Sequence, residues 1–428
     1  MPVIAVVGAL WGDEGKGHLV DYLSRDAEIV MRVQGGDNAG HTVVNEYGTF
    51  RMHLVPSGIF NPHTTCLIGA GTVVNPDTLL QELAELEAAG VDTGRLLISD
   101  RAHLVFPHHR RRDELEERGR GDRPLGTTRR GIGPAYSDKA ARIGVRMGDL
   151  LHRDWLHRRL QQTHAALAAR LRALGEEPPP LEELIARCET WRERLKGRIV
   201  DTIPLLQAAI RRDARIVLEG QLGAMRDLDW GIYPYVTSSN TLVGYAAVGA
   251  GIPPQAIREV IGVVKAFATA VGEGPLVTEV HGELAERLRR GGPPEGWEFG
   301  ATTGRPRRCG WPDGVALRHA AWLNGFTALA VTKLDVLDGL EEIWLCVGYR
   351  LPSGQVLTHV PDTPYLEQAT PVYERLPGWA GPTADARRWE DLPEAARRYL
   401  QRLAQLAEAP VRYVSVGPGR DQIIEVGP

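Results

Sequence analysis

Two acidic residues lie inside a glycine-rich segment close to the start of this sequence. Asp13 and Glu14 interrupt the segment VVGALWGDEGKG, in which Lys16 follows them. An apolar run, a glycine-rich turn and a helix together aim backbone N–H groups at an anion, the usual arrangement for binding phosphate. A carboxylate repels phosphate unless it binds Mg²⁺ or serves as a base, so the acidic pair predicts one of these two functions.

The segment differs from the common phosphate-binding loop GxxxxGK[ST]. That pattern requires glycine at position 10 and serine or threonine at position 17, where this sequence has Leu10 and Gly17. A plain turn is therefore the alternative interpretation of the glycines, although it leaves the acidic pair unexplained.

A second glycine-rich turn, RVQGGDNAGHTVV, carries a single histidine. His41 lies between Gly40 and Thr42, shortly after an apolar run. A solvated or hydrogen-bonded imidazole is the simpler interpretation of a lone loop histidine. Together with Asp13 in the other strand-end loop, it predicts an acid–base pair.

Three further segments carry groups that bind anions. The first, GTTRRGIGPAYSDKAARIGVR, joins a Gly–Thr turn to basic residues, and a surface loop that caps a helix explains it equally well. The second, YVTSSN, supplies hydroxyl groups that either bind an anion or cap the following helix. The third, EFGATTGRPRRCGWPD, places Arg305, Arg307 and Arg308 after a small-residue loop, and arginine binds carboxylates through paired hydrogen bonds.

A sixth segment, ALAVTKLDVLDGL, ends an apolar run with Lys333 and Asp335. A carboxylate in this position accepts hydrogen bonds from N1–H and the 2-amino group of guanine, while the lysine stem covers the ring. Adenine has no such pair of donors, so the motif predicts selection of guanine.

These loops need a frame that brings strand ends together. Short apolar runs alternate along the chain with helical patterns, and strands that alternate with helices form parallel sheets. The runs are Val3–Gly8, Ile29–Val33, Cys66–Ala70, Leu96–Ser99, Ile216–Glu219, Val260–Phe267, Ala328–Thr332, Ile343–Tyr349 and Val411–Val416. We therefore expect an α/β fold, a single large domain over residues 1–428. It would surround a mostly parallel central sheet with a modified phosphate-binding loop. Helical and small β elaborations would include a helical excursion at about residues 150–200.

Composition excludes several classes of function. The formal net charge of −4 and pI near 6.4 give no basic field for nucleic acid. No stretch approaches the roughly 20 apolar residues of a membrane helix, and the N-terminus has no basic leader. The four cysteines are far apart and form no CxxC pair, which indicates neither zinc nor disulfides. We expect a cytoplasmic protein that binds neither membranes nor nucleic acid.

Six segments in this order resemble the adenylosuccinate synthetase (IMP–aspartate ligase) family: WGDEGKG, GGDNAGHT, GTTRRGIGPAY, YPYVTSSN, FGATTGR and TKLDVLDGL. The resemblance extends from Val3 to about Arg420. It implies a one-domain α/β fold, an obligate homodimer, and the first committed step of AMP synthesis from IMP. In that reaction GTP, IMP and L-aspartate give GDP, phosphate and adenylosuccinate with Mg²⁺, through a 6-phosphoryl-IMP intermediate.

The resemblance also implies roles for individual residues. Asp13 would be the base that removes the N1 proton of IMP, and it would bind Mg²⁺ together with the Gly40 carbonyl. His41 would be the acid partner, and Arg142 would reach the IMP of the partner subunit. The implied GTP site is Gly12, Glu14, Gly15, Lys16, Gly17, Gly40, His41, Thr42, Arg307, Lys333, Leu334, Asp335, Ser415, Val416 and Gly417. The implied IMP site is Asp13, Lys16, Asn38, Ala39, Gly40, His41, Thr128, Arg142, Leu222, Thr237 and Arg305. The implied aspartate site is Ala301, Thr302, Thr303, Gly304, Arg305 and Arg307.

Some positions differ from the family pattern. Leu10 and Leu222 stand where the family usually has glutamine, and the second glutamine is expected to contact IMP. Gln221 could substitute for it only if the loop shifts. Two alternatives therefore stay open: the same chemistry on another 6-oxopurine nucleotide such as GMP or dGMP, or a guanine-nucleotide-binding protein without catalysis.

Overall fold

The computed structural model describes residues 3–300 and 304–427. A ten-stranded sheet forms its centre, and every neighbouring pair of strands in it is parallel except β18 and β19. Across the sheet the strands are β19 (Ile423–Glu425), β18 (Val411–Ser415), β14 (Ala328–Thr332), β11 (Ile257–Lys265), β1 (Val3–Gly8), β10 (Ile216–Glu219), β2 (Ile29–Arg32), β5 (Thr65–Ile68), β7 (Leu96–Ser99) and β9 (Ile199–Val200). The predicted α/β fold with a mostly parallel sheet is confirmed.

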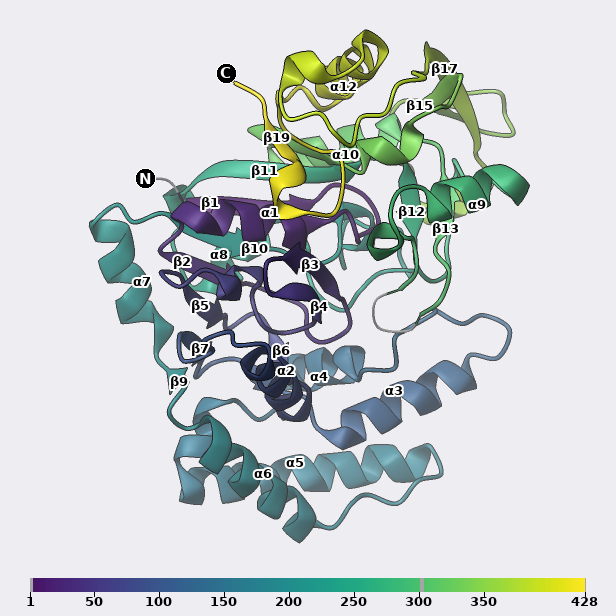
Figure 1. Cartoon of the computed structure of the whole chain (residues 1–428). Helices are drawn as coiled ribbons and strands as arrows, with labels where there is room; N and C mark the ends of the chain where they lie inside the picture. The colour runs from purple at the N-terminus through teal and green to yellow at the C-terminus, as the bar shows by residue number, and fades with distance from the viewer. Residues whose placement is uncertain (1–2, 301–303, 428) are drawn as a thin grey trace.

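Helices cover both faces of this sheet (Figure 1). In β1, Ile4 and Val6 point to one face and Val3 and Ala5 to the other, and all four are buried because each face has its own helical layer. The first layer contains α1 (Lys16–Leu23), α2 (Pro76–Ala88), α5 (Arg153–Ala173) and α6 (Leu181–Leu195). The second contains α7 (Thr202–Arg211), α8 (Val243–Ala250), α10 (Gly314–Asn324) and α12 (Glu394–Ala407).

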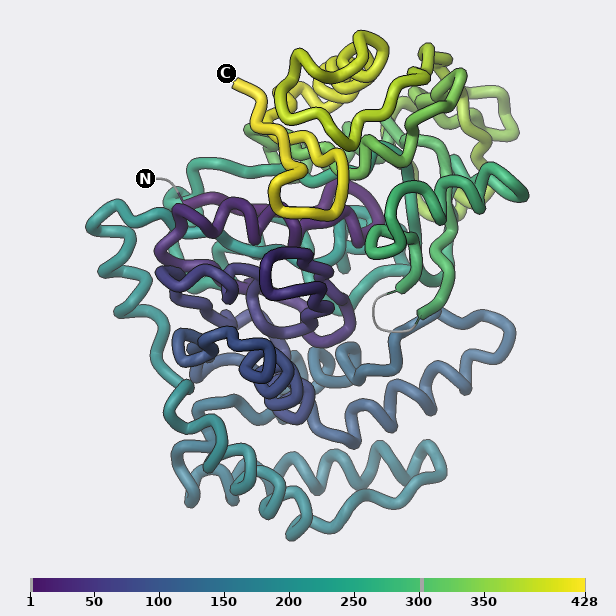
Figure 2. Tube along the Cα trace, viewed as in Figure 1, coloured from purple at the N-terminus to yellow at the C-terminus, as the bar shows by residue number. Residues whose placement is uncertain are grey.

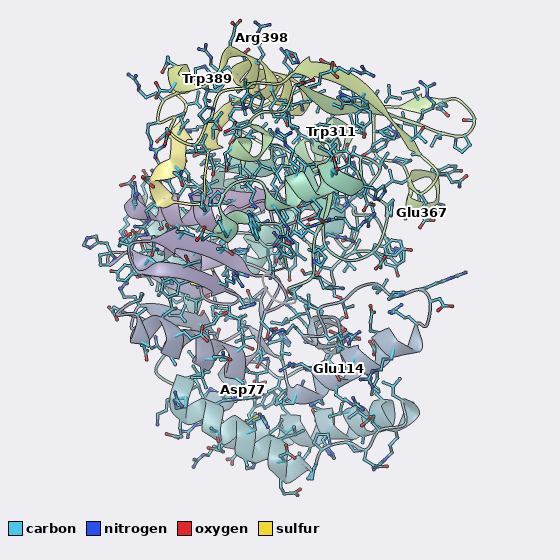
Figure 3. The ribbon with its side chains drawn as sticks, turned by 45° about the vertical axis from the view of Figure 1, so that its right-hand side comes forward. Asp77, Glu114, Trp311, Glu367, Trp389 and Arg398 are labelled. Atoms are coloured by element: carbon cyan, nitrogen blue, oxygen red, sulfur yellow. The ribbon has the colours of Figure 1, made fainter. Side chains whose placement is uncertain are left out.

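The segment at about residues 150–200 consists mainly of α5 and α6, which lie below the sheet in Figure 1. Asp77 of α2, labelled in Figure 3, accepts a hydrogen bond of 2.6 Å from the Trp191 indole and pairs with Arg187 at 3.0 Å. These contacts join α6 to α2 within the first helical layer.

Further elements lie outside the central sheet and its two helical layers. They are the hairpin β3 (His41–Asn45) and β4 (Gly48–Met52), the pairs β6 (Val73–Val74) with β8 (His103–Leu104) and β12 (Ala268–Ala270) with β13 (Arg308–Gly310), and the helices α3 (Pro107–Gly119), α4 (Ile132–Ala140), α9 (Gly282–Arg290) and α11 (Thr363–Leu366). Within the described residues, no helix combines the length and apolar character required to span a membrane.

One predicted strand lies outside the central sheet. Ile343–Tyr349 falls within β15 (Glu342–Arg350), which pairs antiparallel with β16 (Val356–Leu357) and β17 (Thr370–Pro377). Antiparallel neighbours and a half-exposed outer face separate it from the two-sided burial of the parallel strands.

The two ends of the chain meet at the front of the molecule. The tube in Figure 2 shows the last segment, in yellow, crossing in front of the N-terminal elements, in purple. His18 of α1 bonds the Gly419 carbonyl through Nε2 at 2.9 Å, and the Arg420 guanidinium donates to the Asp21 carboxylate. Residues near both ends therefore contribute to one site.

Candidate active site

The loop between β1 and α1 is organised by one of its two acidic residues. Glu14 is 1% exposed, and its Oε1 accepts hydrogen bonds from the backbone N–H groups of Leu10 at 3.0 Å and Gly12 at 2.8 Å. Its Oε2 accepts a hydrogen bond of 2.6 Å from Lys16 Nζ. Glu14 thus fixes the loop backbone and Lys16 through hydrogen bonds and does not line a cavity. Of the two acidic residues only Asp13, at φ 60°, lines the cavities at the strand ends.

The same loop shows why position 17 has no side chain. A Cβ on Gly17 would lie 2.7 Å from the Cβ of His41, closer than two carbon atoms can approach. An ordinary phosphate loop has a serine or threonine at this position, whereas here glycine leaves the space that the His41 side chain occupies.

His41 is oriented by a buried carboxylate at the end of β10. Glu219 Oε1 bonds His41 Nδ1 and also accepts from Ser57 Oγ at 2.7 Å, while Oε2 accepts from the Ser57 N–H at 2.9 Å. Burial raises the pKa of Glu219, but His41, Arg32 and Ser57 together lower it to about 2. The carboxylate is therefore ionised, and Nε2 is the ring nitrogen that His41 can offer to a ligand in the cavity.

Glu298 pairs with three cations beside the phosphate loop. Its Oε2 accepts from Lys265 Nζ at 2.7 Å and Arg307 at 2.6 Å, and its Oε1 accepts from Lys333 Nζ at 2.5 Å. Burial opposes its ionisation, but the three cations hold the pKa of Glu298 far below its ordinary value. Arg307 also lies 3.0 Å from Asp13 through Nε, and against the effect of burial it lowers the pKa of Asp13.

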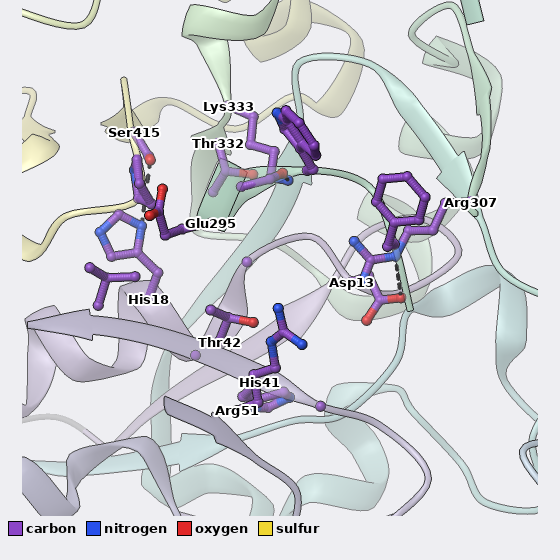
Figure 4. A pocket seen from close by; sticks show the side chains of 18 of the residues that line it. Asp13, His18, His41, Thr42, Arg51, Glu295, Arg307, Thr332, Lys333 and Ser415 are labelled. Atoms are coloured by element: carbon purple, nitrogen blue, oxygen red, sulfur yellow. Dashed lines mark hydrogen bonds and ion pairs between the residues drawn. The ribbon is translucent and has the colours of Figure 1, made fainter. Parts of the chain in front are cut away.

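Beside these groups lie two cavities that share part of their lining (Figure 4 shows the first). The first, about 330 Å³ in volume, extends from Asp13, Lys16 and His41 to Asp335 and Ser415. The second, about 530 Å³, extends from Asp13 to Thr128 and Thr237. Five residues line both cavities: Asp13, Ala39, Gly40, Leu222 and Gly300. Asp13 therefore lies where the two cavities adjoin.

The predicted site residues divide between the cavities. Those of the GTP set that line the first cavity are Gly15, Lys16, Gly17, Gly40, His41, Thr42, Arg307, Lys333, Asp335, Ser415 and Gly417; those of the set that do not are Gly12, Glu14, Leu334 and Val416. Those of the IMP set that line the second cavity are Asp13, Asn38, Ala39, Gly40, Thr128, Leu222 and Thr237. Lys16 and His41 of that set line only the first cavity.

Two predicted arginines, Arg142 and Arg305, line neither cavity. Arg142 is exposed on the surface of the chain. Arg305 donates a hydrogen bond of 2.9 Å to the Gly126 carbonyl at the rim of the second cavity. Of the predicted aspartate loop, Gly304 and Arg307 line the first cavity, while Ala301, Thr302 and Thr303 lie outside the described residues.

The far end of the first cavity has the chemistry of a guanine site. Burial raises the pKa of Asp335 to about 6, and its Oδ1 is buried without a hydrogen-bond partner among the described residues. A buried acceptor without a partner costs free energy that a ligand with N–H donors recovers. Lys333, at φ 59°, stands beside it.

Gln221 does not take the place of the glutamine that the family usually has at position 222. Its side-chain amide accepts from the Gly36 N–H at 2.9 Å and donates to the Gly36 carbonyl at 2.9 Å and to Asn38 Oδ1 at 3.2 Å. Gln221 therefore supports the loop that carries Asn38 and faces neither cavity. Leu222, at φ 60°, presents its apolar side chain instead.

The hydroxyl run at 237–240 is not a helix cap. Helix α8 begins only at Val243, with Leu242 as its N-cap and no side-chain cap bond. Thr237 and Ser238 line the second cavity, so the anion-binding interpretation of this run is the one that agrees with the geometry.

A separate cluster of His108, His109 and Asp138 does not fit a metal ion. Both nitrogens of His109 are occupied, since Nδ1 accepts from the Phe106 N–H at 3.0 Å and Nε2 bonds Asp138 at 3.2 Å. Asp138 also pairs with Arg112 and Arg170, whose charges repel a cation.

Four charged residues of the site were absent from the sequence prediction: Arg51, Glu219, Lys265 and Glu298. Glu219 and Lys265 each end a buried strand, and the carboxyl ends of parallel strands meet at one edge of a sheet. A charged residue at the end of an apolar run was therefore the sequence feature that could have identified Glu219 and Lys265. Arg51 lies on a polar hairpin and gave no such signal.

A parallel α/β sheet carries a glycine-rich loop, His41 and the carboxylates of Asp13 and Asp335 at its strand ends, beside two cavities that share lining residues. This arrangement is typical of an enzyme that binds nucleotides. Comparison with known proteins gives the family. The model of the adenylosuccinate synthetase family matches residues 5–424, and the chain belongs to that family. The chain is 48% identical to an adenylosuccinate synthetase of Heliobacterium modesticaldum, covering 100% of this chain and 99% of that one. It is 50% identical to one of Synechococcus sp., covering 100% and 97%.

Solved structures agree. A fully ligated adenylosuccinate synthetase from Plasmodium falciparum superimposes with a TM-score of 0.93 at 35% identity, covering 99% of this chain and 100% of that one. A cyanophage S-2L succinoaminodeoxyadenylate synthetase bound to dGMP and dATP shares the fold, with a TM-score of 0.62 at 20% identity over 99% and 95% of the two chains. The protein is thus a GTP-dependent ligase of purine biosynthesis that joins L-aspartate to IMP.

Proposed function

We propose that GTP occupies the first cavity and IMP the second, with the reaction at their shared wall. The observation that carries this assignment is that Asp13 and Gly40 line both cavities, while Asp335 lies only in the first and Thr128 and Thr237 only in the second. A transferred phosphoryl group must lie where the two nucleotides touch, and the predicted base already stands there.

The chemistry follows from this placement. Asp13 accepts the N1 proton of IMP, and the electron pair moves to O6, which attacks the γ-phosphorus. As the new O–P bond forms, the bond to the bridging oxygen breaks and GDP leaves. The amine of L-aspartate then adds at C6, loses a proton, and displaces phosphate. His41 donates from Nε2 to the phosphoryl oxygens, because their negative charge favours the imidazolium that Glu219 stabilises.

The residues at the wall shared by the two cavities also fit a Mg²⁺ ion. A carboxylate and a backbone carbonyl beside phosphate oxygens are the ligands it prefers, and Asp13 and Gly40 line the wall that both nucleotides reach. When bound, the ion would neutralise charge on the triphosphate.

The aspartate site would adjoin Arg307. Its guanidinium pairs with Asp13, so a substrate carboxylate that recruits Arg307 would free the base. We assign Gly304 and Arg305 with Ala301, Thr302 and Thr303 to the loop that closes over this substrate. We further propose a single domain, a cytoplasmic homodimer, and Arg142 reaching the IMP phosphate of the partner subunit, since Arg142 is exposed on its own protomer.

The decisive experiment is a mass-resolved assay of the purified protein with Mg²⁺, GTP, L-aspartate and either IMP or GMP. We expect GTP-dependent adenylosuccinate from IMP and no product from GMP. Leu222 would then be a tolerated change of the pocket wall. Product from GMP alone would contradict the proposed assignment of the second cavity.

Replacing Asp335 by Asn tests guanine recognition. Loss of a charged acceptor should raise the KM for GTP by about tenfold or more and should reduce the preference for GTP over ITP, which lacks the 2-amino group. Because the pKa of Asp335 is about 6, its carboxylate is protonated below that pH, so the wild-type KM for GTP should rise as the pH falls through 6. The variant should lack this dependence. Equal use of GTP and ITP by the wild type would contradict the assignment.

Replacing Glu219 by Gln tests the orientation of His41. We expect kcat to fall about a hundredfold with little change in the KM for GTP, because Glu219 contacts the histidine and not the ligand. Removing the negative charge also lowers the pKa of His41, so the alkaline limb of the kcat profile should move to lower pH. A purely structural role for Glu219 would leave that limb in place.

A further inference from the structure

The hairpin β3–β4 contributes a basic side chain to the nucleotide cavity that no motif of the family resemblance included. Thr42 and Arg51 are direct partners across the hairpin, so their side chains lie on the same face. Both line the first cavity, as does Val44 two residues further along β3. Figure 4 shows Arg51 extending into the cavity beside His41 and Thr42.

Arg51 differs from the other strongly basic side chains of this cavity in its partners. Lys16 is paired with Glu14 at 2.6 Å, Lys333 with Glu298 at 2.5 Å, and Arg307 with both Glu298 and Asp13. Arg51 forms no hydrogen bond or ion pair within residues 3–300 and 304–427. Its guanidinium therefore carries a positive charge into the cavity that no protein carboxylate offsets.

Its position determines which part of a nucleotide it can reach. The base end of the cavity is marked by Asp335 and Ser415, and the opposite end by Lys16, Gly17 and His41. Arg51 belongs to the second group because its strand partner directly follows His41. Phosphoryl transfer spreads negative charge over three oxygens, and an arginine fork is the side chain best suited to neutralise it.

We propose that Arg51 binds the terminal phosphate of GTP and stabilises the charge that develops on it during transfer to IMP. The proposal rests on the assignment of GTP to the first cavity. It makes Arg51 a catalytic residue of this enzyme, supplied within the chain by the hairpin that also carries His41 and Thr42.

The test measures the affinity of Arg51→Gln for GTP and for GDP, by calorimetry at fixed Mg²⁺ and ionic strength. Loss of one charge-assisted contact should weaken GTP about tenfold and should change GDP less than about twofold, because GDP lacks the γ-phosphate. Turnover should fall by at least the same factor, and Arg51→Lys should recover part of the GTP affinity, since the charge remains without the fork. Arg258→Gln, which removes an exposed positive charge from β11, is the matched control and should behave as wild type.

Two results would overturn the proposal: equal weakening of GTP and GDP, or unchanged GTP affinity and turnover. Asp335→Asn, measured in parallel, separates this failure from failure of the cavity assignment. It should weaken GTP and GDP alike because both carry guanine. If it weakens neither, the first cavity is not the guanine nucleotide site.

Discussion

Asp13→Asn should lower kcat by about a hundred- to ten-thousand-fold, the usual contribution of a general base. The amide cannot accept the N1 proton of IMP, so O6 stays a weak nucleophile. Asn keeps the size of the side chain, and the Glu14 bonds that hold the loop are untouched. GTP affinity should therefore stay within about threefold, since the loop N–H groups and Lys16 remain in place.

The measurement is steady-state formation of adenylosuccinate together with GTP titration of the same preparation. Asp154→Asn is the matched control, because Asp154 is an exposed carboxylate at the start of α5 and lines neither cavity. A variant at position 13 that retained turnover within tenfold of wild type would show that the base lies elsewhere.

Glu298→Gln should lower the free energy of unfolding by about 3–5 kcal/mol, the usual effect of removing one partner from a buried charge cluster. Lys265, Lys333 and Arg307 would then face one another without the carboxylate that binds all three. The largest part of this loss should come from the charge of Lys265, because its side chain is 1% exposed and burial already lowers its pKa to about 8.

Chemical denaturation followed by tryptophan fluorescence measures this effect. Glu394→Gln is the control, since its pair with Arg398 is exposed and such pairs contribute little. A double variant, Glu298→Gln with Lys265→Met, should recover part of the loss because it removes one of the uncompensated charges. If Glu298→Gln unfolded at the wild-type denaturant concentration, the cluster would not be a stabilising element.

The sequence predicted the strands of the central sheet well because two-sided burial gives continuous apolar runs, as in Val3–Gly8 and Ala328–Thr332. The run Ile343–Tyr349 also forms a strand, but β15 pairs antiparallel with β16 and β17, the next two strands along the chain, and so lies outside the central sheet. Pairing partners depend on tertiary contacts that a local pattern does not encode.

The same limit applies to the site. Motifs located Asp13, His41 and Asp335, but the chemistry of the glycine-rich motif alone did not separate Asp13 from Glu14, and only the family resemblance gave them different roles. Only the left-handed backbone at Asp13 turns its carboxylate into the cavities, while Glu14 turns back into the loop. Glu298 had no predicted role, because only Arg307 of its three partners lies in the same motif, while Lys265 and Lys333 come from two other segments.

The position of β1 in the sheet has a consequence for synthesis of the chain. Its first residues pair with Ile216 of β10 and Ile257 of β11, so the strand that carries the phosphate loop emerges from the ribosome long before either neighbour. Ser415 and Gly417, which complete the same cavity, emerge last. The strand that carries the catalytic loop thus has neither of its sheet neighbours until Ile216–Glu219 has been synthesised, and a chain that stops short of β18 lacks one wall of the first cavity. Folding of an N-terminal fragment alone therefore cannot complete the first cavity.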